Sequence, residues 1–568
     1  MTTLEQAKQE ALAAFLTALP SEAPVPTDAD FVKPPQADMG DLSFPCFGLS
    51  KSLKTNPAAL AKDIAAKIVV GGMLAEARAV GPYVNFFFDK KVFASSMLEE
   101  VFARGIEYGN APKTGERVLI EYAAPNTHKE IHVGHLRNFF IGLSTVNLFR
   151  AAGGEVIPVN YINDNGANVT KCLWAYKKFH DGEVPVDRRS KFLGAVYTEA
   201  TQYAEEHQEE SKVEISDVQK KLDAKDPEWT TLWRTTRDWC LEEYRNIFAE
   251  LRLSFEKDYL ASEFEGSGKQ TVRELLEKGI AKRGDGGAVI MDFEEEKLGV
   301  FLLLKSDGSA LYSTFDLGLA PKKFQDFPGV SRSLHVVDNR QSLYFKQLFA
   351  TLRKMGFDFP MHHIAHDFVT LAEGAMSSRK GNIITYEDFR DRMIDMVADE
   401  TRKRRDGWSE QKIKDTAWVI AEGAMKFAML KQDNDRPIVF EMEAALSFDG
   451  FTGPYIQYAH ARLCSILARA GESGEKYELS DDPVDYALLR LVADFPATVL
   501  AAAALYRPSL LSQYLFDLAQ ASNDFYRDAP VLSAEPDVRA RRLAVIRAAK
   551  ITLENGLELL GIRAPEEM

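Results

Sequence analysis

The sequence predicts an α/β protein whose central parallel-sheet domain lies between an α+β N-terminal domain and an all-α C-terminal domain. Near residue 140, a strand, a helix and a second strand follow one another within about fifty residues, which is the pattern of a βαβ unit. After about residue 447, strand patterns give way to long helical ones. The length of 568 residues is enough for three or four domains of about 150 residues each.

Composition places the chain among ordinary globular proteins. Hydrophobic residues make up 46% and charged residues 27%, which excludes collagen-like and wholly disordered chains. The first ten residues alternate apolar and charged positions and do not form the apolar core of a secretory signal. The most apolar stretch, Thr498 to Leu505, is far shorter than the ~20 residues of a membrane-spanning helix. We therefore expect a soluble, cytoplasmic protein with no membrane partner.

The cysteines argue against a metal site. Cys46, Cys172, Cys240 and Cys464 are scattered, and none belongs to a Cys-x-x-Cys pair. We expect reduced, buried thiols, no structural metal and no disulfide framework.

The net charge of −15 counts against a protein whose whole surface binds nucleic acid. Local basic tracks are still compatible with it, because phosphate contacts act within roughly one Debye length, ~8 Å at physiological salt. Three candidate tracks are Arg402 to Arg405, Arg188 to Lys191, and the group Arg539, Arg541, Arg542 and Arg547. For any one of them alone, a solvated helix face is the favoured interpretation.

The predicted N-terminal domain runs from residue 1 to about Pro112. It opens with an amphipathic helix, and a proline-rich loop from Pro20 to Pro35 follows. We expect a second helix from Pro57 to Val69 and an apolar strand from Tyr83 to Phe88. The mixture of helix and strand makes this block α+β.

The central domain runs from about Lys113 to Leu446 and is expected to be Rossmann-like. Its βαβ unit consists of a strand at 117–122, a helix at 134–149 that stops at Gly153-Gly154, and a strand at 156–162. In such a parallel sheet, ligands bind beyond the carboxyl ends of the strands. A charged, helical stretch from Lys171 to Lys282 predicts an insertion. Strand patterns return at 288–293, 300–304, 333–337 and 363–369.

From about Ser447 to residue 568 the chain predicts a helical bundle. Apolar residues recur at helical spacing in four segments: Tyr458 to Ala470, Pro483 to Leu505, Pro508 to Tyr526, and Val538 to Leu560. A loop rich in glycine and charge, Gly471 to Asp482, separates the first two segments.

The strongest local feature is His132-Val133-Gly134-His135, where the loop from Ala123 to Ile131 meets the helix. A helix N-terminus carries unpaired N–H groups and about half a positive charge, which suits a nucleotide triphosphate. Gly134 would let an adenine ring approach the backbone, and the two imidazoles could hydrogen-bond phosphate and ribose oxygens. For so short a pattern, a pair of capping or core histidines is an equally good interpretation.

A second feature favours the nucleotide site. Gly374 to Asn382 follows a strand pattern and combines small residues, a turn and the adjacent cations Arg379 and Lys380. A basic loop that closes over a triphosphate stabilises the transition state more than the ground state. By itself this loop would be interpreted as an exposed turn with incidental charge. The two features together indicate a site for a nucleotide.

His132 to His135 and Ala375 to Arg379 resemble the HIGH and KMSKS signatures of class I aminoacyl-tRNA synthetases, in the expected order. The flanking sequence resembles the arginine-specific family, arginyl-tRNA synthetase. The matching segments cover nearly the whole chain: 81–85, 121–129, 160–166, 306–316, 450–462 and 556–562. So many long matches in one order are not expected by chance.

The resemblance implies an arginine pocket and an ATP site. A guanidinium is planar, always charged and carries five donors, so a selective pocket needs carboxylates and oriented acceptors. Tyr312 and Asp316 lie four residues apart and would share one helical face, and the apolar neighbours of Asp316 indicate a buried, paired carboxylate. The residues assigned to arginine are Glu121, Asn126, Tyr312, Asp316 and Gln341. Those assigned to ATP are His132, Gly134, His135, Met376, Ser377, Ser378 and Arg379.

The chain departs from the general class I signature at several positions. Ala375 and Arg379 stand where the signature has its two lysines. Arginine-specific members often lack the full lysine pair, and the family's lysine just before HIGH is held to compensate. Lys129 occupies that place, and Lys380 is the competing catalytic cation. The residues Tyr344, Asn165 and Asn168 also differ from those usual in the family, which leaves the shape of the amino-acid pocket open.

The resemblance further implies a two-step reaction on L-arginine, ATP and tRNA(Arg). The arginine carboxylate attacks the α-phosphorus of ATP, with Mg²⁺ carried by ATP, and the adenylate is then transferred to the 3′ end of the tRNA. The N-terminal domain would contact the tRNA elbow and the bundle would contact the anticodon. The anticodon candidates are Tyr455, Tyr458, His460 and Arg462, although packing of Tyr458 in the core is an equally good interpretation. A monomer is the family expectation.

Three alternatives compete with this assignment. A nucleotidylyltransferase also uses a His-x-Gly-His site, but it would not need the helical bundle. A catalytically silent tRNA-binding paralogue would be expected to lack His132, His135 or the basic loop, and all are present. A cysteine-specific synthetase should show clustered zinc ligands, which the sequence lacks.

Overall fold

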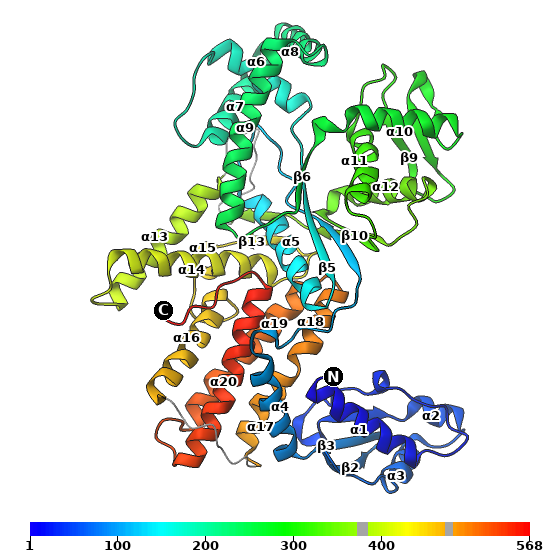
Figure 1. Cartoon of the computed structure of the whole chain (residues 1–568), viewed down its shortest axis with the longest axis vertical. Coiled ribbons are helices and arrows are strands. Elements are labelled where there is room, and N and C mark those ends of the chain that lie inside the picture. Colours follow the sequence, from blue (N-terminus) through cyan, green and yellow to red (C-terminus); the bar gives the residue numbers. More distant parts are fainter. Residues whose placement is uncertain (372–383, 472–480) are drawn as a thin grey trace.

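The computed structural model describes residues 1–371, 384–471 and 481–568 (Figure 1). An N-terminal domain lies at one end of the molecule, beside the C-terminal helices. The parallel sheet lies between those helices and two outlying parts, one spanning residues 167–250 and the other made of residues 265–326 and 342–354. The fold class expected from the sequence is confirmed, with an α+β domain, a parallel-sheet domain and an all-α bundle.

The N-terminal domain packs helices on an antiparallel sheet of order β1-β3-β2. Helix α1 begins at a capping box formed by Thr2 and Glu5, in which each side chain accepts from the backbone of the other residue. Phe15 of this helix packs on the rings of Phe31 and Phe44 and closes the core. The elements are α1 (Thr3–Ala18), β1 (Leu42–Pro45), α2 (Phe47–Ser52), α3 (Pro57–Ala65), β2 (Leu74–Val80) and β3 (Tyr83–Phe88).

Helix α4 (Lys90–Arg104) leads out of this domain and packs against α17 (Pro483–Ala493) and α20 (Pro536–Leu559) of the bundle. The Tyr108 hydroxyl donates to the carbonyl of Val492 at 2.8 Å. The Tyr486 hydroxyl donates to the Asp41 carboxylate at 2.7 Å. These contacts join the N-terminal domain to the C-terminal helices.

The central sheet contains five parallel strands in the order β11-β10-β4-β5-β6. The chain passes from β4 to β5 and β6 on one side, and returns later to β10 and β11 on the other side of β4. Open parallel sheets bind ligands at the carboxyl ends of the strands where the strand order reverses in this way. The elements are β4 (Arg117–Glu121), α5 (Val133–Ala151), β5 (Glu155–Ile162), β6 (Lys257–Leu260), β10 (Arg332–Asp338) and β11 (Met361–His366). The predicted βαβ unit is therefore present as β4-α5-β5.

Two sequence expectations for the central domain are wrong in their details. The stretch from 171 to 282 is not wholly an insertion, because β6 within it pairs in parallel with β5 of the main sheet. The strands expected at 288–304 form, but they belong to a separate antiparallel sheet, β7-β8-β9. Strand pairing depends on contacts distant in sequence, which local periodicity does not encode. The helical insertion consists of α6 (Ala167–Phe179), α7 (Arg189–Glu206), α8 (Gln208–Asp223) and α9 (Pro227–Glu250).

A small α/β unit lies at one edge of the molecule and includes helix α11 (Figure 1). This helix contacts the main sheet, because its Lys323 donates to Glu121 of β4. The unit consists of α10 (Glu265–Glu277), β7 (Lys282–Arg283), β8 (Val289–Phe293), β9 (Gly299–Leu304), α11 (Tyr312–Asp326) and α12 (Ser342–Lys354). Its core is separate from the main core and contains Phe293, Phe301 and Leu317. This unit and the sheet together hold the acidic residues of the site.

The bundle contains the expected helical segments with one correction. Pro483 to Leu505 is two helices, α17 and α18 (Phe495–Ala504), because Pro496 lacks a backbone N–H and lies in the first turn of a new helix. The segment Pro483–Ala504 has the length and apolar character of a membrane-spanning helix, so the apolar stretch is longer than the expected Thr498 to Leu505. Half of its apolar window is buried inside the protein. The other bundle helices are α16 (Gly453–Ala470) and α19 (Pro508–Asp528).

Between β11 and the bundle lie β12 (Val369–Leu371), α13 (Tyr386–Arg404), α14 (Glu410–Leu430), β13 (Ile438–Phe440) and α15 (Met442–Ala445).

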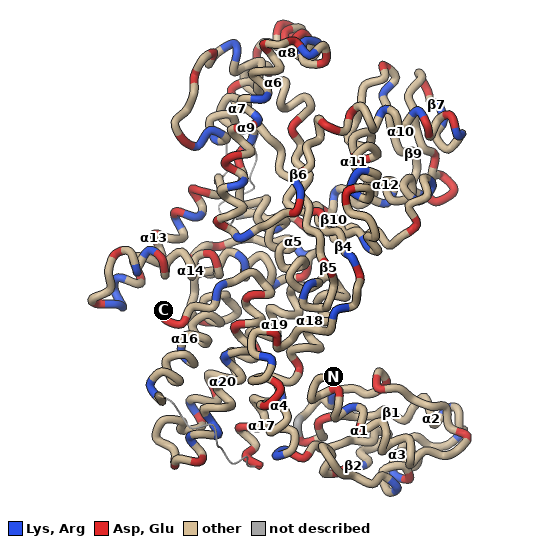
Figure 2. The backbone as a smooth tube through the Cα atoms, in the orientation of Figure 1, with Lys and Arg blue, Asp and Glu red and all other residues tan. Residues whose placement is uncertain are grey.

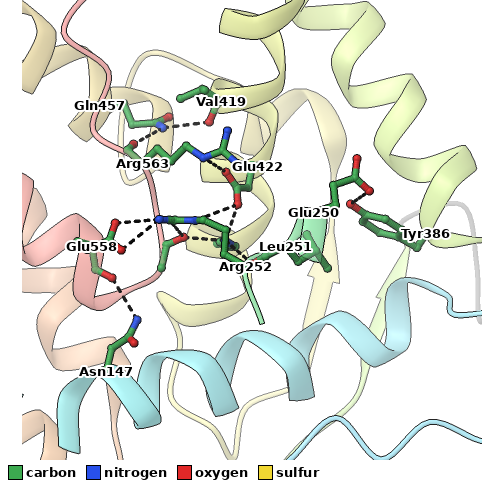
Figure 3. A network of polar contacts seen from close by, with 12 residues as sticks. Asn147, Glu250, Leu251, Arg252, Tyr386, Val419, Glu422, Gln457, Glu558 and Arg563 are labelled. Carbon is green, nitrogen blue, oxygen red and sulfur yellow. Dashed lines mark hydrogen bonds and ion pairs between the residues drawn. The ribbon is translucent and has the colours of Figure 1, made fainter. Parts of the chain in front are cut away.

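A buried charge network joins the sheet domain to the end of the bundle (Figure 3). The fully buried Glu422 of α14 lies 2.6 Å from Lys426 Nζ and 3.3 Å from Arg563 Nε. Lys426 also donates to the carbonyls of Leu251 at 3.1 Å and Gly561 at 2.7 Å. Burial lowers the pKa of Lys426 to about 8. Buried charges of this kind are tolerated only when they are paired.

Acidic and basic residues are interspersed along the backbone (Figure 2). Each of the three candidate basic tracks has carboxylate partners from the chain itself. Arg404 lies 2.8 Å from Glu400, and Arg188 lies 2.8 Å from Asp388. Arg541 is buried and pairs with Asp485. These pairs support the interpretation of the tracks as solvated or internally neutralised helix faces.

Candidate active site

The loop from Ala123 to Ile131 carries backbone strain where β4 passes into α5. Ala123, Ala124 and His128 have positive φ values of 73°, 45° and 59°. A left-handed conformation costs a residue with a side chain roughly 1–2 kcal/mol. Two amides hold the loop, since Ala123 N donates to Asn138 Oδ1 at 2.7 Å and Ala124 N donates to Asn160 Oδ1 at 3.0 Å. Strain that surrounding contacts impose in this way is characteristic of functional sites.

Helix α9 of the insertion supports the same loop. The His128 ring lies 2.9 Å from Thr236 Oγ1, and burial lowers the pKa of His128 to about 3. The Tyr244 hydroxyl donates to the carbonyl of Asn126 at 2.8 Å. The insertion therefore takes part in positioning the site.

His132 and His135 cap the N-terminus of α5. The Gly134 backbone nitrogen donates to His132 Nδ1 at 3.1 Å, and the His132 backbone nitrogen donates to His135 Nδ1 at 3.1 Å. The capping interpretation of the pair is therefore correct as far as Nδ1 is concerned. It leaves the Nε2 atoms for a second role.

Both rings are neutral at physiological pH. Burial, reinforced by the charge of Lys129, lowers the pKa of His132 to about 4. Burial also holds the pKa of His135 well below its ordinary value. A neutral imidazole whose Nδ1 accepts a hydrogen bond carries its proton on Nε2. The helix end therefore combines two neutral Nε2–H donors with its own unpaired N–H groups, a set suited to phosphate and ribose oxygens.

The segment that follows the predicted basic loop is tied to this helix end. Met376, Ser377, Ser378, Arg379 and Lys380 lie outside the described residues. Directly after them, Thr385 forms an isolated antiparallel bridge with His132, and the Tyr386 amide donates to the carbonyl of Ile131 at 2.8 Å. The Tyr386 hydroxyl also bonds Glu250 at the end of α9 (Figure 3). Lys129 lies close enough to His132 and His135 to shift their pKa values, and its ammonium lies 5.1 Å from the centre of the Tyr197 ring.

Asp316 of α11 is a partly buried carboxylate that faces two tyrosines. The hydroxyls of Tyr344 and Tyr161 hydrogen-bond this carboxylate. Burial raises the pKa of Asp316 to about 7, and the nearby Glu121 charge adds to the rise while the Tyr344 hydrogen bond opposes it. A desolvated carboxylate of this kind gains from the arrival of a cation.

Glu121 lies at the end of β4, beside Asp316. Its Oε2 lies 2.7 Å from Lys323 Nζ, and its Oε1 lies 3.2 Å from His335 Nδ1 of the neighbouring strand β10. Burial by itself would raise the pKa of Glu121, but Lys323 and His335 hold it well below its ordinary value. Glu121 is therefore ionised and already paired inside the protein.

The other predicted arginine residues lie at the surface of this region. Tyr312 begins α11 one turn before Asp316 and is 61% exposed. Asn126 and Gln341 are exposed, and Asn126 Oδ1 accepts from Asn163 Nδ2 at 2.8 Å. Asn168 Oδ1 accepts from the Tyr197 hydroxyl at 3.0 Å. Glu121, Tyr161 and His335 come from the adjacent strands β4, β5 and β10, so the acidic residues share the sheet edge from which the loop to His132 leaves.

Comparisons with known proteins match each of the three domains of this chain. Residues 3–88 match the family described as arginyl tRNA synthetase N terminal domain, and residues 97–442 match the tRNA synthetases class I (R), catalytic domain. Residues 456–568 match the DALR anticodon binding domain. An arginine–tRNA ligase of Bdellovibrio bacteriovorus is 37% identical over 550 residues, which cover 94% of this chain and 94% of that protein. The chain belongs to the arginyl-tRNA synthetase family.

Other members of the arginyl-tRNA synthetase family show the same extent of similarity. An arginine–tRNA ligase of Treponema denticola is 34% identical, with coverage of 96% of this chain and 95% of that protein. The solved arginyl-tRNA synthetase of Thermus thermophilus superposes with a TM-score of 0.80 at 26% identity, over 99% of this chain and 100% of that one. The resemblance inferred from the sequence is therefore confirmed across the whole chain, and none of these similarities favours a silent paralogue.

The predicted anticodon residues of this arginyl-tRNA synthetase family member divide into exposed and buried ones. Tyr458 is 43% exposed on α16 and packs edge-on against Phe448. Arg462 lies 4.9 Å from the centre of the Tyr526 ring, and the Tyr455 hydroxyl accepts from Asn523 Nδ2 at 3.2 Å. His460 is fully buried, and its Nδ1 lies 2.9 Å from the carbonyl of Pro565. The expectation that His460 contacts RNA is wrong, because the ring packs in the core under the C-terminal segment.

Sequence reasoning missed Lys323, Tyr161 and His335, and it noticed Tyr344 only as a departure from the family. Lys323 had a detectable signal. It lies seven residues after Asp316, so the two share one face of a helix, and a lysine on a buried helix face is expected to be paired. The pairing partner, Glu121, lies 202 residues away in sequence and had no such signal. Among the described residues, no cluster of three or more His, Cys, Asp or Glu could hold a metal.

Proposed function

We propose that this chain activates L-arginine with ATP and transfers it to the 3′ end of tRNA(Arg). The observation that carries the proposal is a desolvated carboxylate, Asp316, at the same sheet edge as a helix N-terminus capped by two neutral histidines. A guanidinium requires the first and a triphosphate the second. Family membership supports the pairing of these two ligands in one reaction.

In the activation step, the arginine carboxylate attacks the α-phosphorus of ATP and pyrophosphate leaves. The Nε2–H groups of His132 and His135 donate to phosphate and ribose oxygens, and Gly134 gives the nucleotide access to the backbone. The site offers hydrogen-bond donors and cations, which fits a Mg²⁺ that arrives on the phosphates of ATP. That Mg²⁺ would spread the charge of the leaving group when bound. Lys129 supplies positive charge to the phosphates, with Lys380 as the competing cation and Met376, Ser377, Ser378 and Arg379 contributing from the loop.

In the amino-acid pocket, Asp316 pairs with the guanidinium and the Tyr161 and Tyr344 hydroxyls orient its carboxylate. Tyr312 and Gln341 line the exposed side, and Asn126 holds the α-amino or carboxyl group. Glu121 lies at the buried side of the pocket. A pocket built on such bonds discriminates by roughly 10⁴-fold or more against analogues that leave them unpaired.

In the transfer step, the adenylate esterifies the ribose at the 3′ end of the tRNA. We propose that Tyr455, Tyr458 and Arg462 contact the anticodon by stacking and edge hydrogen bonds. The N-terminal domain contacts the tRNA elbow. We further propose that the protein acts in the cytoplasm as a monomer, without a membrane partner.

ATP–pyrophosphate exchange tests the proposal. The rate is measured with each amino acid in turn, with and without total tRNA. We expect exchange with L-arginine and with no other amino acid. Exchange with a different amino acid, or none with L-arginine in the presence of tRNA, would show that the assignment is wrong.

A further inference from the structure

Lys323 is a buried lysine that the reaction just described does not use. Its side chain is 4% exposed, and the Glu121 side chain beside it is 8% exposed. The Nζ–Oε2 distance of 2.7 Å makes the contact a charge-assisted hydrogen bond. A lysine is almost never buried to this extent unless its charge is neutralised. The structure shows which of the two nearby carboxylates neutralises it: Glu121.

The two carboxylates at this sheet edge are therefore not equivalent. Both oxygens of Glu121 are occupied, one by Lys323 and the other by His335 at 3.2 Å. The Asp316 carboxylate instead meets the uncharged hydroxyls of Tyr161 and Tyr344. His335 is neutral as well, because burial lowers its pKa. The charges of Glu121 and Lys323 cancel. Lys323 also acts on Asp316 at longer range, but among the residues that the structure describes no cation forms a salt bridge with Asp316.

We infer that Lys323 is a specificity-determining residue of the arginine pocket: it neutralises Glu121, so that Asp316 alone supplies the counter-charge for the guanidinium. The inference rests on the proposed function and refines the role of Glu121. Glu121 becomes a positioning residue that acts through Lys323. The single negative charge of Asp316 then matches the single positive charge of the guanidinium of L-arginine. A buried pocket with balanced charge avoids leaving an unpaired ion in a region of low dielectric.

The inference predicts how Glu121 and Lys323 depend on each other. In Glu121→Gln, the Lys323 ammonium loses its counter-charge and repels the incoming guanidinium. We expect the Kd for L-arginine to rise by about tenfold or more, which corresponds to a loss of one charge pair. In the Lys323→Met background there is no ammonium for Glu121 to neutralise, so the same substitution leaves no uncompensated cation in the pocket. There we expect a change of less than about threefold.

The experiment is a double-mutant cycle on the full chain. The Kd for L-arginine is measured by titration calorimetry for the wild type, Glu121→Gln, Lys323→Met and the double variant. Lys322→Met is the matched control, because Lys322 is the neighbouring lysine of the same helix and pairs at the surface with Asp326. We expect that control to bind L-arginine like the wild type. Thermal unfolding by circular dichroism verifies that each variant is folded.

A second measurement uses the unmodified protein. The groups that face Asp316 are Glu121, Tyr161, Lys323 and Tyr344, and His335 lies behind Glu121. If Lys323 keeps Glu121 ionised, binding of L-arginine releases one proton, that of Asp316. The logarithm of Kd should then fall by about one per pH unit between roughly pH 5.5 and 6.5.

The outcomes separate the inference from the proposed function. Equal effects of Glu121→Gln in the two backgrounds, whether large or close to one, would show that Glu121 does not act through Lys323. A pH slope near two would show that Glu121 also takes up a proton, and would overturn the inference as well. In either case L-arginine still binds and the proposed function stands. If the wild type does not bind L-arginine at all, both are overturned.

Discussion

His132 and His135 are hydrogen-bonded to each other at the N-terminus of α5: the backbone nitrogen of His132 donates to His135 Nδ1 at 3.1 Å. His132 Nδ1 in turn accepts from the Gly134 amide at 3.1 Å. Each ring thus bonds the helix through Nδ1, and its Nε2 is the proposed ligand donor. The structural and catalytic roles of the pair can be separated by substitution.

The substitution His132→Asn is expected to keep the cap and remove the ligand donor. Asparagine is among the best capping residues, so the free energy of unfolding should change by less than about 0.5 kcal/mol. Loss of one preorganised donor should lower the rate of pyrophosphate exchange by about 10²–10³-fold. Urea unfolding and exchange assays measure the two effects, with the exposed His207→Asn as control. Undiminished exchange would mean that the histidine only caps the helix.

The acid limb of arginine binding is expected to follow Asp316. L-arginine pairs with the ionised carboxylate, so binding is fully available above the pKa of about 7 and weakens as the pH falls through it. The Tyr344 hydrogen bond lowers that pKa, and its removal in Tyr344→Phe should raise the midpoint by about one pH unit. Calorimetric Kd values across the pH range measure the shift, with Tyr455→Phe as control. A midpoint that stays in place or moves to lower pH would contradict this role of Tyr344.

Lys129 is expected to carry more of the phosphate charge in activation than Lys380. Lys129→Ala should lower the rate of pyrophosphate exchange by about tenfold or more, because a cation near the leaving group stabilises the transition state. Lys171→Ala is a matched control, since Lys171 lies 5.9 Å from the same Tyr197 ring. A full rate in Lys129→Ala together with a loss in Lys380→Ala would transfer the role to the loop.

Tyr458 and His460 should respond differently to substitution by alanine. Tyr458 is 43% exposed, and loss of a stacking ring should weaken tRNA binding by roughly 1–3 kcal/mol while leaving stability nearly unchanged. His460→Ala removes a buried ring and leaves the Pro565 carbonyl without its partner, which should cost about 1–3 kcal/mol of stability. Filter binding of tRNA and urea unfolding distinguish the two. Weaker tRNA binding by a stably folded His460→Ala variant would restore the original assignment.

Glu422 is expected to be critical for stability at the junction of the sheet domain and the bundle. Glu422→Gln leaves the buried Lys426 and the partly exposed Arg563 without this counter-charge. Removal of one partner from a buried pair such as Glu422–Lys426 costs about 3–5 kcal/mol. Glu558→Gln is the control, because the Glu558 side chain is 63% exposed and its pair with Arg252 contributes at most about 1 kcal/mol. Urea unfolding measures both variants. Similar midpoints for the two would show that the buried network is dispensable.

Local patterns were sufficient to predict the parts of the site that lie close together in sequence. The strand at Arg117, the helix after His132 and the strand ending at Ile162 have the periodicities of a βαβ unit, and this unit places a helix N-terminus at the carboxyl edge of a sheet. The resemblance of the segments around Tyr312 and Asp316 located the acidic helix. These features are short-range, so hydrophobic spacing and turn residues encode them directly.

Only the tertiary structure decided which distant residues meet. The pairing of β6 with β5 joins strands separated by the helices α6 to α9, and the pairing of Lys323 with Glu121 joins residues 202 positions apart. His460 is buried because the C-terminal segment packs over it. The local sequence does not distinguish it from Tyr458 and Arg462 on the same helix. Periodicity fixes which face of an element is apolar, but the partner of that face is chosen by packing and charge balance across the whole chain. The family and the reaction follow from the sequence, while the roles proposed for Asp316 and Glu121 rest on contacts that only the fold creates.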